Sequence, residues 1–188
     1  PAPSGTTGFD IVAGKDVLHV ELIAADTVHV QFRAAGAAPS SSLVIDPTLA
    51  ARHPFAASVH RDGDVLRLDS PQLHVSWDPA RRELDIADAQ QRTLLRQHDP
   101  VDALRRGKPG FVHASGEPLY GIGGYNATED VSAGLLRKGD QQARAGEQGH
   151  AGAPFVWSTA GYGILLDANG ASFSLGDTRI DASMPAAH

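Results

Sequence analysis

The sequence predicts an all-β protein, an antiparallel β-sandwich, on three observations. Apolar and polar residues alternate with a period of two along much of the chain, helical periodicity is scarce, and turn-forming dipeptides separate the alternating segments. Apolar residues make up 41% of the 188 residues, which is enough for a core at this length. We therefore expect about a dozen short strands in two packed layers.

The alternation is clearest near the start of the chain. Leu18, Val20 and Leu22 fall on one face of a predicted strand, and His19 and Glu21 fall on the other. Such alternation is typical of antiparallel strands with one face in water, so we expect the apolar face to be buried. The apolar positions of the other predicted strands are Val28, Val30, Phe32, Leu66, Leu68, Leu73, Val75, Trp77, Leu84 and Ile86.

Two dipeptides predict tight hairpins. Asp62-Gly63 and Asn169-Gly170 are of the kind that supplies positive φ at both central positions of a type I′ turn. Each turn would pair apolar residues on one face of its two strands. The expected cross-strand pairs are Val59 with Leu66, Leu166 with Phe173, and Ile164 with Leu175.

Three segments lack regular alternation. Residues 34–57 are rich in Ala, Pro and Ser, and we expect a loop there with one short strand near Val44. Residues 99–110 contain two prolines and two glycines and predict a connection between two halves of the sheet system, with a helical turn over 102–106. Residues 139–153 hold four glycines and predict a long exposed loop.

Composition excludes several kinds of function. A net charge of -6 argues against nucleic acid as a partner, and the absence of cysteine excludes disulfides and thiolate metal sites. No apolar stretch reaches the roughly 18 residues that a membrane span needs. The expected partner is small and neutral, or another part of the same protein. The small residues at positions 1–5 resemble a trimmed start and predict a periplasmic or secreted protein, with a cytoplasmic location still open.

The histidines and glycines do not predict a metal site or a nucleotide site. His19 and His29 would lie near each other across a hairpin, on its polar face. No carboxylate or third histidine stands at ligand spacing and the HExxH pattern is absent, so no metal site is expected. His150 is expected to cap a backbone group in its loop. Residues 121–124 resemble half of a dinucleotide fingerprint, but Asn126 stands where glycine is needed and no helix pattern follows. No cofactor is expected.

Four segments in the last third of the chain resemble the N-terminal domain of family 31 glycoside hydrolases. They are residues 118–123 (Pro-Leu-Tyr-Gly-Ile-Gly), 154–158 (Pro-Phe-Val-Trp-Ser), 161–167 (Gly-Tyr-Gly-Ile-Leu-Leu-Asp) and 173–176. The resemblance implies a galactose-mutarotase-like β-sandwich that precedes a catalytic (β/α)8 barrel. The whole protein would then be a retaining hydrolase of α-linked glucosyl, xylosyl or related oligosaccharides and glycosides.

The resemblance also implies how the chain is organised. Residues 1–188 would form a single N-terminal domain, ordered from about residue 8 to about residue 180, that packs on the C-terminal barrel of the same chain. The family's nucleophile and acid/base are aspartates of the barrel, which this sequence does not contain. No catalytic residue is therefore expected here, and this part alone would not be an enzyme.

A substrate contact can be carried over from the family. In several members a loop between the signature segments reaches the sugar, and residues 136–141 (Leu-Arg-Lys-Gly-Asp-Gln) resemble its motif with one inserted residue. The resemblance implies that Asp140 and Gln141 bind substrate. A carboxylate can accept hydrogen bonds from two sugar hydroxyls at once, and loops on a rigid sandwich commonly carry binding groups.

Two alternatives remain beside the accessory domain. A free-standing carbohydrate-binding module would need an exposed aromatic platform, but strand phase predicts that Trp77 is buried and that Trp157 is buried with Phe155. The module is therefore the weaker reading.

The other alternative is a mutarotase-like sugar epimerase. That enzyme would need a strand histidine and a glutamate together in a sugar cleft. The late glutamates are Glu117, Glu129 and Glu147, and none is expected to pair with His113 or His150.

Overall fold

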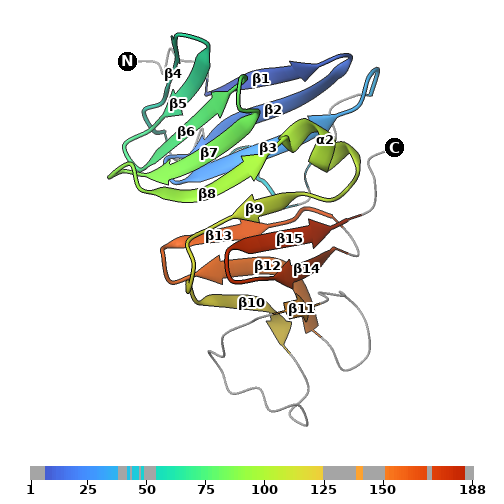
Figure 1. Cartoon of the computed structure of the whole chain (residues 1–188). Coiled ribbons are helices and arrows are strands. Elements are labelled where there is room, and N and C mark those ends of the chain that lie inside the picture. Colours follow the sequence, from blue (N-terminus) through green and yellow to red (C-terminus); the bar gives the residue numbers. More distant parts are fainter. Residues whose placement is uncertain are drawn as a thin grey trace. The chain divides into compact units, whose positions relative to one another are not determined.

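The computed structural model describes residues 7–37, 42, 44–46, 48, 54–124, 139–141, 151–168 and 171–184. Fifteen strands and one short helix lie in these residues (Figure 1). The chain forms two compact units with a boundary between Arg105 and Arg106, inside the segment that the sequence predicts as a connection. None of the described helices is long and apolar enough to cross a membrane.

The first unit contains two antiparallel sheets. Neighbouring strands follow one another along the chain, in the orders β1-β2-β3 and β4-β5-β6-β7-β8. The strands are β1 (Gly8–Ala13), β2 (Asp16–Ala24), β3 (Thr27–Arg33), β4 (Ser58–Asp62), β5 (Val65–Asp69), β6 (Leu73–Asp78), β7 (Glu83–Asp88) and β8 (Thr93–His98).

The core of this unit follows the predicted alternation. Leu18, Val20 and Leu22 of β2 are fully buried, and they share one apolar cluster with residues of the second sheet such as Leu68. Trp77 packs against the same cluster, as its strand phase predicts. Burying an aliphatic side chain of this size contributes about 1.5–3 kcal/mol, so this cluster is the main source of stability for the unit.

The hairpin predicted at residues 62–63 forms one residue further along. Asp62 pairs with Val65, so the two turn residues are Gly63 and Asp64, and Gly63 takes a φ of 58°. Leu66 consequently faces Arg61, and Val59 faces Leu68 rather than Leu66. The register differs from the prediction by two residues, and a shift of two keeps every side chain on its predicted face.

The short strand predicted near Val44 is wrong for the residues described there. Ser42 Oγ accepts hydrogen bonds from the backbone N–H groups of Val44 and Ile45, at 3.1 and 3.0 Å. Asp46 Oδ1 likewise accepts one from the N–H of Thr48 at 2.8 Å. Such side chains satisfy the backbone locally and so compete with strand pairing.

A short helix, α2 (Pro100–Arg105), ends the first unit and overlaps the predicted helical turn. Pro100 is its first residue, a position where the missing N–H costs nothing. Pro100, Val101 and Ala103 are buried, and Val101 belongs to the core cluster.

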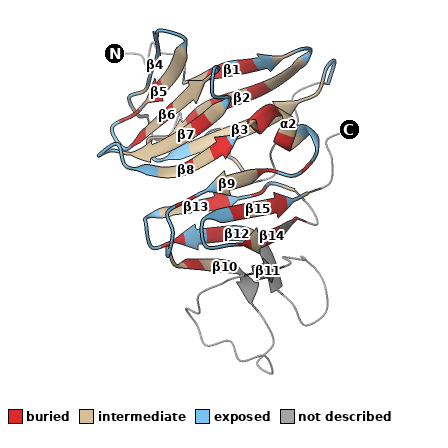
Figure 2. Cartoon of the chain, in the orientation of Figure 1, coloured by how far each residue is buried: buried red, intermediate tan, exposed pale blue. Residues whose placement is uncertain are grey.

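The second unit also contains two antiparallel sheets (Figure 1). Their strand orders are β10-β12-β13 and β11-β14-β15-β9. The strands are β9 (Gly110–Val112), β10 (Leu119–Gly124), β11 (Gly139–Gln141), β12 (Ala151–Ser158), β13 (Tyr162–Leu165), β14 (Ser172–Leu175) and β15 (Arg179–Ser183). Figure 2 shows that both sheets contribute buried residues, which include Leu119, Val156, Ile164, Phe173, Leu175 and Ile180.

The predicted hairpin between residues 164–166 and 173–175 is wrong. β13 pairs with β12 in one sheet, whereas β14 pairs with β11 and β15 in the other. Leu166 and Phe173 are both buried, but they are not cross-strand partners. Residues 169 and 170, on which the prediction rested, lie outside the described residues.

The long loop predicted over residues 139–153 contains strand at both ends. Residues 139–141 form β11, and residues 151–153 begin β12. Residues 142–150 lie outside the part of the chain that the structure describes.

The architecture confirms the predicted fold class. The regular secondary structure of the described residues is almost entirely antiparallel strand, arranged as sheets with an apolar inner face and a polar or exposed outer face. The prediction of one domain over residues 1–188 stays a prediction.

Candidate functional site

The predicted substrate-binding residues, Asp140 and Gln141, lie in β11. The pairing of β11 with β14 places Asp140 opposite Ser174 and Gln141 opposite Phe173. This pairing therefore holds the backbone of both residues against β14. Their contact with a sugar stays a prediction.

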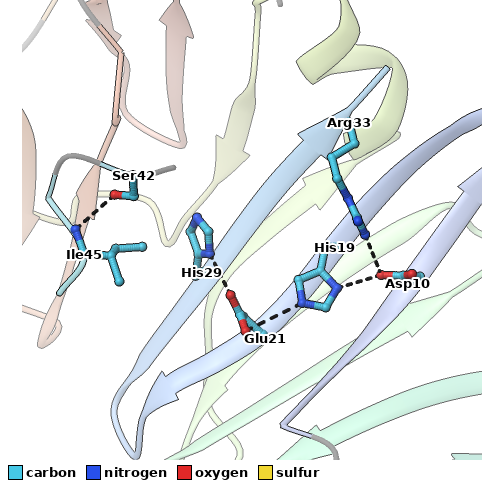
Figure 3. Close-up of polar contacts among 7 residues, drawn as sticks. All are labelled: Asp10, His19, Glu21, His29, Arg33, Ser42 and Ile45. Atoms are coloured by element: carbon cyan, nitrogen blue, oxygen red, sulfur yellow. Dashed lines mark hydrogen bonds and ion pairs between the residues drawn. The ribbon is translucent and has the colours of Figure 1, made fainter. Parts of the chain in front are cut away.

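A row of polar side chains crosses the outer face of the β1-β2-β3 sheet (Figure 3). His19 Nδ1 lies 2.6 Å from Asp10 Oδ1, and its Nε2 lies 3.6 Å from Glu21 Oε2. Glu21 Oε1 in turn lies 3.0 Å from His29 Nδ1, and Arg33 Nη2 lies 3.3 Å from Asp10 Oδ1. We call these five residues the polar row.

The polar row corrects one detail of the sequence analysis, because carboxylates do meet both histidines. The two carboxylates alternate along a line with His19, His29 and Arg33. Each carboxylate is therefore shared between two neighbours, and the carboxylates do not converge on one point. Across the described residues, no three His, Asp or Glu side chains are placed to hold a metal ion. The row lies on the solvent side of the sheet and contributes little to stability, as exposed ion pairs generally do.

A second polar group is buried in the second unit, contrary to the expectation that Glu117 pairs with no histidine. His113 Nδ1 lies 3.8 Å from Glu117 Oε2, and both side chains are almost fully buried. Burial raises the pKa of the Tyr162 hydroxyl, and hydrogen bonding to Glu117 and the charge of that carboxylate raise it further. We call His113, Glu117 and Tyr162 the buried polar cluster.

The buried polar cluster contains a histidine and a glutamate, the residue types that a sugar epimerase needs. Unlike the residues of such an enzyme, they are not accessible to a sugar. A sugar must reach a general acid and a general base directly to exchange protons with them. His113 is fully enclosed, and its Nδ1 lies 2.9 Å from the carbonyl oxygen of Ala114. A sugar therefore has no direct access to His113 in this structure. Glu129, Glu147 and His150, the other residues considered for this chemistry, lie outside the described residues.

An apolar face covers the outer side of the β10-β12-β13 sheet. Phe155, Trp157 and Leu165 are 40%, 42% and 49% exposed. Tyr120 lies opposite Trp157 across the strand pair, and their rings stack with centroids 4.7 Å apart at an interplanar angle of 23°. We call these four residues the apolar face.

The exposure of Trp157 and Phe155 shows that their predicted burial is wrong. On β12 the inward positions belong to Val156 and Ser158, both buried. The strand carries apolar side chains on both faces, so alternation alone could not tell the inner face from the outer one. Trp77 is inward as predicted, which leaves Trp157 as the tryptophan exposed to solvent.

Comparisons with known proteins connect the fold to one group of enzymes. A 1,6-alpha-glucosyltransferase of Sporosarcina globispora is 29% identical over 160 residues, which cover 82% of this chain and 12% of that protein. No model of a known protein family matches the sequence.

Solved structures match over nearly the whole chain. A GH31 alpha-xylosidase from Xanthomonas citri matches 92% of this chain with a TM-score of 0.68 at 20% identity, and a GH31 dextranase from Flavobacterium johnsoniae matches 99% with a TM-score of 0.69 at 17% identity. The chain has the N-terminal domain fold of family 31 glycoside hydrolases. It spans only 20% and 26% of those two chains, so most of each enzyme lies outside the match.

The segments that resemble the family 31 signature are strands of the second unit. Residues 118–123, 154–158, 161–167 and 173–176 correspond to β10, β12, β13 and β14. The order of the signature thus reflects four strands that build the two sheets of this unit.

Two glycines of the family 31 signature approach Phe155 closely. Gly121 has a φ of 106°, and a Cβ there would lie 2.6 Å from the carbonyl oxygen of Phe155. A Cβ on Gly163 would lie 2.7 Å from Cε2 of the Phe155 ring, so this ring lies against Gly163. Glycine at both positions lets β10 and β13 accommodate Phe155 on the apolar face.

Proposed function

We propose that this chain is the non-catalytic β-sandwich domain of a retaining α-glycoside hydrolase of family 31. The observation that carries this proposal is the fold match. It extends over more than nine tenths of this chain, which spans 20% and 26% of the two matched enzymes. In this proposal the reaction takes place in a separate (β/α)8 barrel, and the domain packs on that barrel. An exported location of the gene product belongs to the proposal and can be tested by cell fractionation.

The domain would also lend β11 to the substrate pocket. Asp140 and Gln141 would bind hydroxyls of an α-linked oligosaccharide, with the carboxylate accepting two hydrogen bonds. The pairing of β11 with β14 supports this role, since a backbone held by a sheet positions binding groups more firmly than a free loop does. Hydrogen bonds to a charged group contribute roughly 1.5–3 kcal/mol each.

The experiment is a pair of substitutions in the complete gene product, Asp140→Asn and Asp140→Ala. We expect kcat/KM on α-linked disaccharides to fall by roughly 10- to 100-fold, the size expected for one charged hydrogen bond. The matched control is Asp64→Asn, which removes an exposed carboxylate from the β4–β5 turn. Kinetics of the Asp140 variants equal to those of the control on every linkage would exclude this role.

A carbohydrate-binding module is the second candidate, because Trp157 and Phe155 are exposed after all. Aromatic rings on a sheet surface can stack on sugar rings. Calorimetric titration of the chain with isomaltotriose distinguishes the two functions. Micromolar affinity that is lost in Trp157→Ala would favour the module, and the accessory domain predicts no tight binding.

A further inference from the structure

The apolar face is contiguous across all three strands of its sheet. Tyr120 of β10 lies opposite Trp157 of β12, and Phe155 of β12 lies opposite Leu165 of β13. On the other side of the same sheet, Leu119, Val156 and Ile164 are buried. The sheet is therefore apolar on both sides, a pattern typical of a sheet that is covered twice.

The chemistry of the apolar face fits a protein surface better than a sugar. Tyr120 and Trp157 stack on each other, so each ring hides one of the faces on which a sugar could stack. The ring of Phe155 lies against Gly163, and its neighbour Leu165 is aliphatic. Sugar sites combine aromatic rings with several hydrogen-bonding groups, whereas protein interfaces have apolar centres rich in aromatic residues.

Chain topology links the apolar face to β11. β10 ends at Gly124 and β12 begins at Ala151, so β11 lies between these two strands in the sequence. A partner that holds β10 and β12 would therefore hold the two strands between which β11 and Asp140 lie in the sequence. In the matched enzymes, the part outside the match is 74–80% of the chain, the complement of the 26% and 20% that are covered.

We propose that the apolar face is the surface on which the catalytic domain of the same polypeptide docks. This inference rests on the proposed function and names the residues of its interdomain contact. Docking buries the stacked pair and the Phe155–Leu165 pair, and it positions β11 relative to the catalytic pocket.

Cysteine labelling tests the proposal, because the chain contains no cysteine of its own. Leu165→Cys places a thiol on the apolar face at a position that is already exposed. Val12→Cys is the matched control, since Val12 is an apolar residue of β1 that is 66% exposed and lies in the other unit. Each variant is made in the 188-residue chain and in the complete gene product, and maleimide labelling of its peptide is followed by mass spectrometry.

We expect Leu165→Cys to label at least tenfold more slowly in the complete gene product than in the 188-residue chain, with little change for Val12→Cys. Equal labelling of Leu165→Cys in both proteins would overturn the inference. Two results with the isolated 188-residue chain would also overturn it. One is slower labelling of Leu165→Cys when isomaltotriose is added, which indicates a sugar site, and the other is slower labelling at high protein concentration, which indicates self-association. Activity of the complete gene product on α-glycosides is measured in parallel. An active enzyme with an unprotected thiol refutes only the docking surface, whereas an inactive one refutes the proposed function.

Discussion

At the scale of single residues, the surroundings of Tyr162 change its chemistry most. Its hydroxyl is buried beside the Glu117 carboxylate. An anionic tyrosine there would meet a second negative charge without water to screen it. The folded protein therefore keeps the Tyr162 hydroxyl protonated at a pH where an unfolded tyrosine ionises.

This raised pKa predicts a loss of stability at alkaline pH. An unfolded tyrosine loses its proton near pH 10, while folded Tyr162 retains it, so proton release favours the unfolded state as the pH rises above about 10. We expect Tyr162→Phe to lose less stability than the wild type between pH 9 and pH 11 in urea unfolding. Tyr120→Phe, which removes a tyrosine hydroxyl from the apolar face, is measured beside it for comparison. Identical slopes for Tyr162→Phe and the wild type would contradict the assignment.

The two glycines next to Phe155 predict different costs for the same substitution. Gly121→Ala forces a side chain into a left-handed φ and against a backbone oxygen, which should cost roughly 2–4 kcal/mol. Gly163→Ala meets the end of an exposed ring that can turn away, and the carbonyl oxygen of Val156 at an ordinary contact distance of 3.4 Å, so the expected cost is below about 1 kcal/mol. Denaturant titration of both variants measures the difference, and equal costs would show that the Phe155 ring is held as firmly as the backbone.

At the scale of elements, the alternation of apolar and polar residues predicts where strands lie better than it predicts which strands pair. In β2 the two faces differ sharply, with Leu18 and Val20 against His19 and Glu21, so the inner face could be read directly. In β12 both faces are apolar, and the inner one depends on tertiary packing. A turn dipeptide between β13 and β14 predicts that these strands pair with each other, but β14 pairs with strands of a different sheet. A local turn signal does not specify the sheet to which a strand belongs.

The clear inner face of β2 predicts a large effect of truncation there. Leu18→Ala removes a fully buried side chain from the core cluster, and we expect it to lower the free energy of unfolding by about 2–5 kcal/mol. Val12→Ala, in the neighbouring β1, removes an exposed side chain and should change stability by less than about 0.5 kcal/mol. Thermal and chemical unfolding give both values. A small effect for Leu18→Ala would mean that the two sheets of this unit do not share one core.

At the scale of the whole molecule, the fold was accessible from the sequence and the functional surfaces were only partly so. The strand segments around Tyr120 and Phe155 carry the resemblance to family 31, because their glycines and aromatic residues meet in one sheet. The exposure of Trp157 and the burial of Glu117 depend on how sheets stack, which no local pattern specifies. Asp140 could be placed in β11 only after the pairing with β14 was known.

The same surfaces predict where activity should be found. The 188-residue chain should not hydrolyse aryl α-glucosides or α-xylosides. Retaining hydrolysis needs two accessible carboxyl groups about 5 Å apart, whereas the carboxyl group of Glu117 is enclosed with His113. The complete gene product should hydrolyse them at a rate in the usual range of enzymes, roughly 1–1000 per second. Release of nitrophenol from nitrophenyl α-glycosides by each of the two proteins measures this directly.

Glu117→Gln in the 188-residue chain is the control for any residual signal. Turnover by the chain that disappears in Glu117→Gln would reassign the buried polar cluster as catalytic and would show that the cluster opens to substrate in solution.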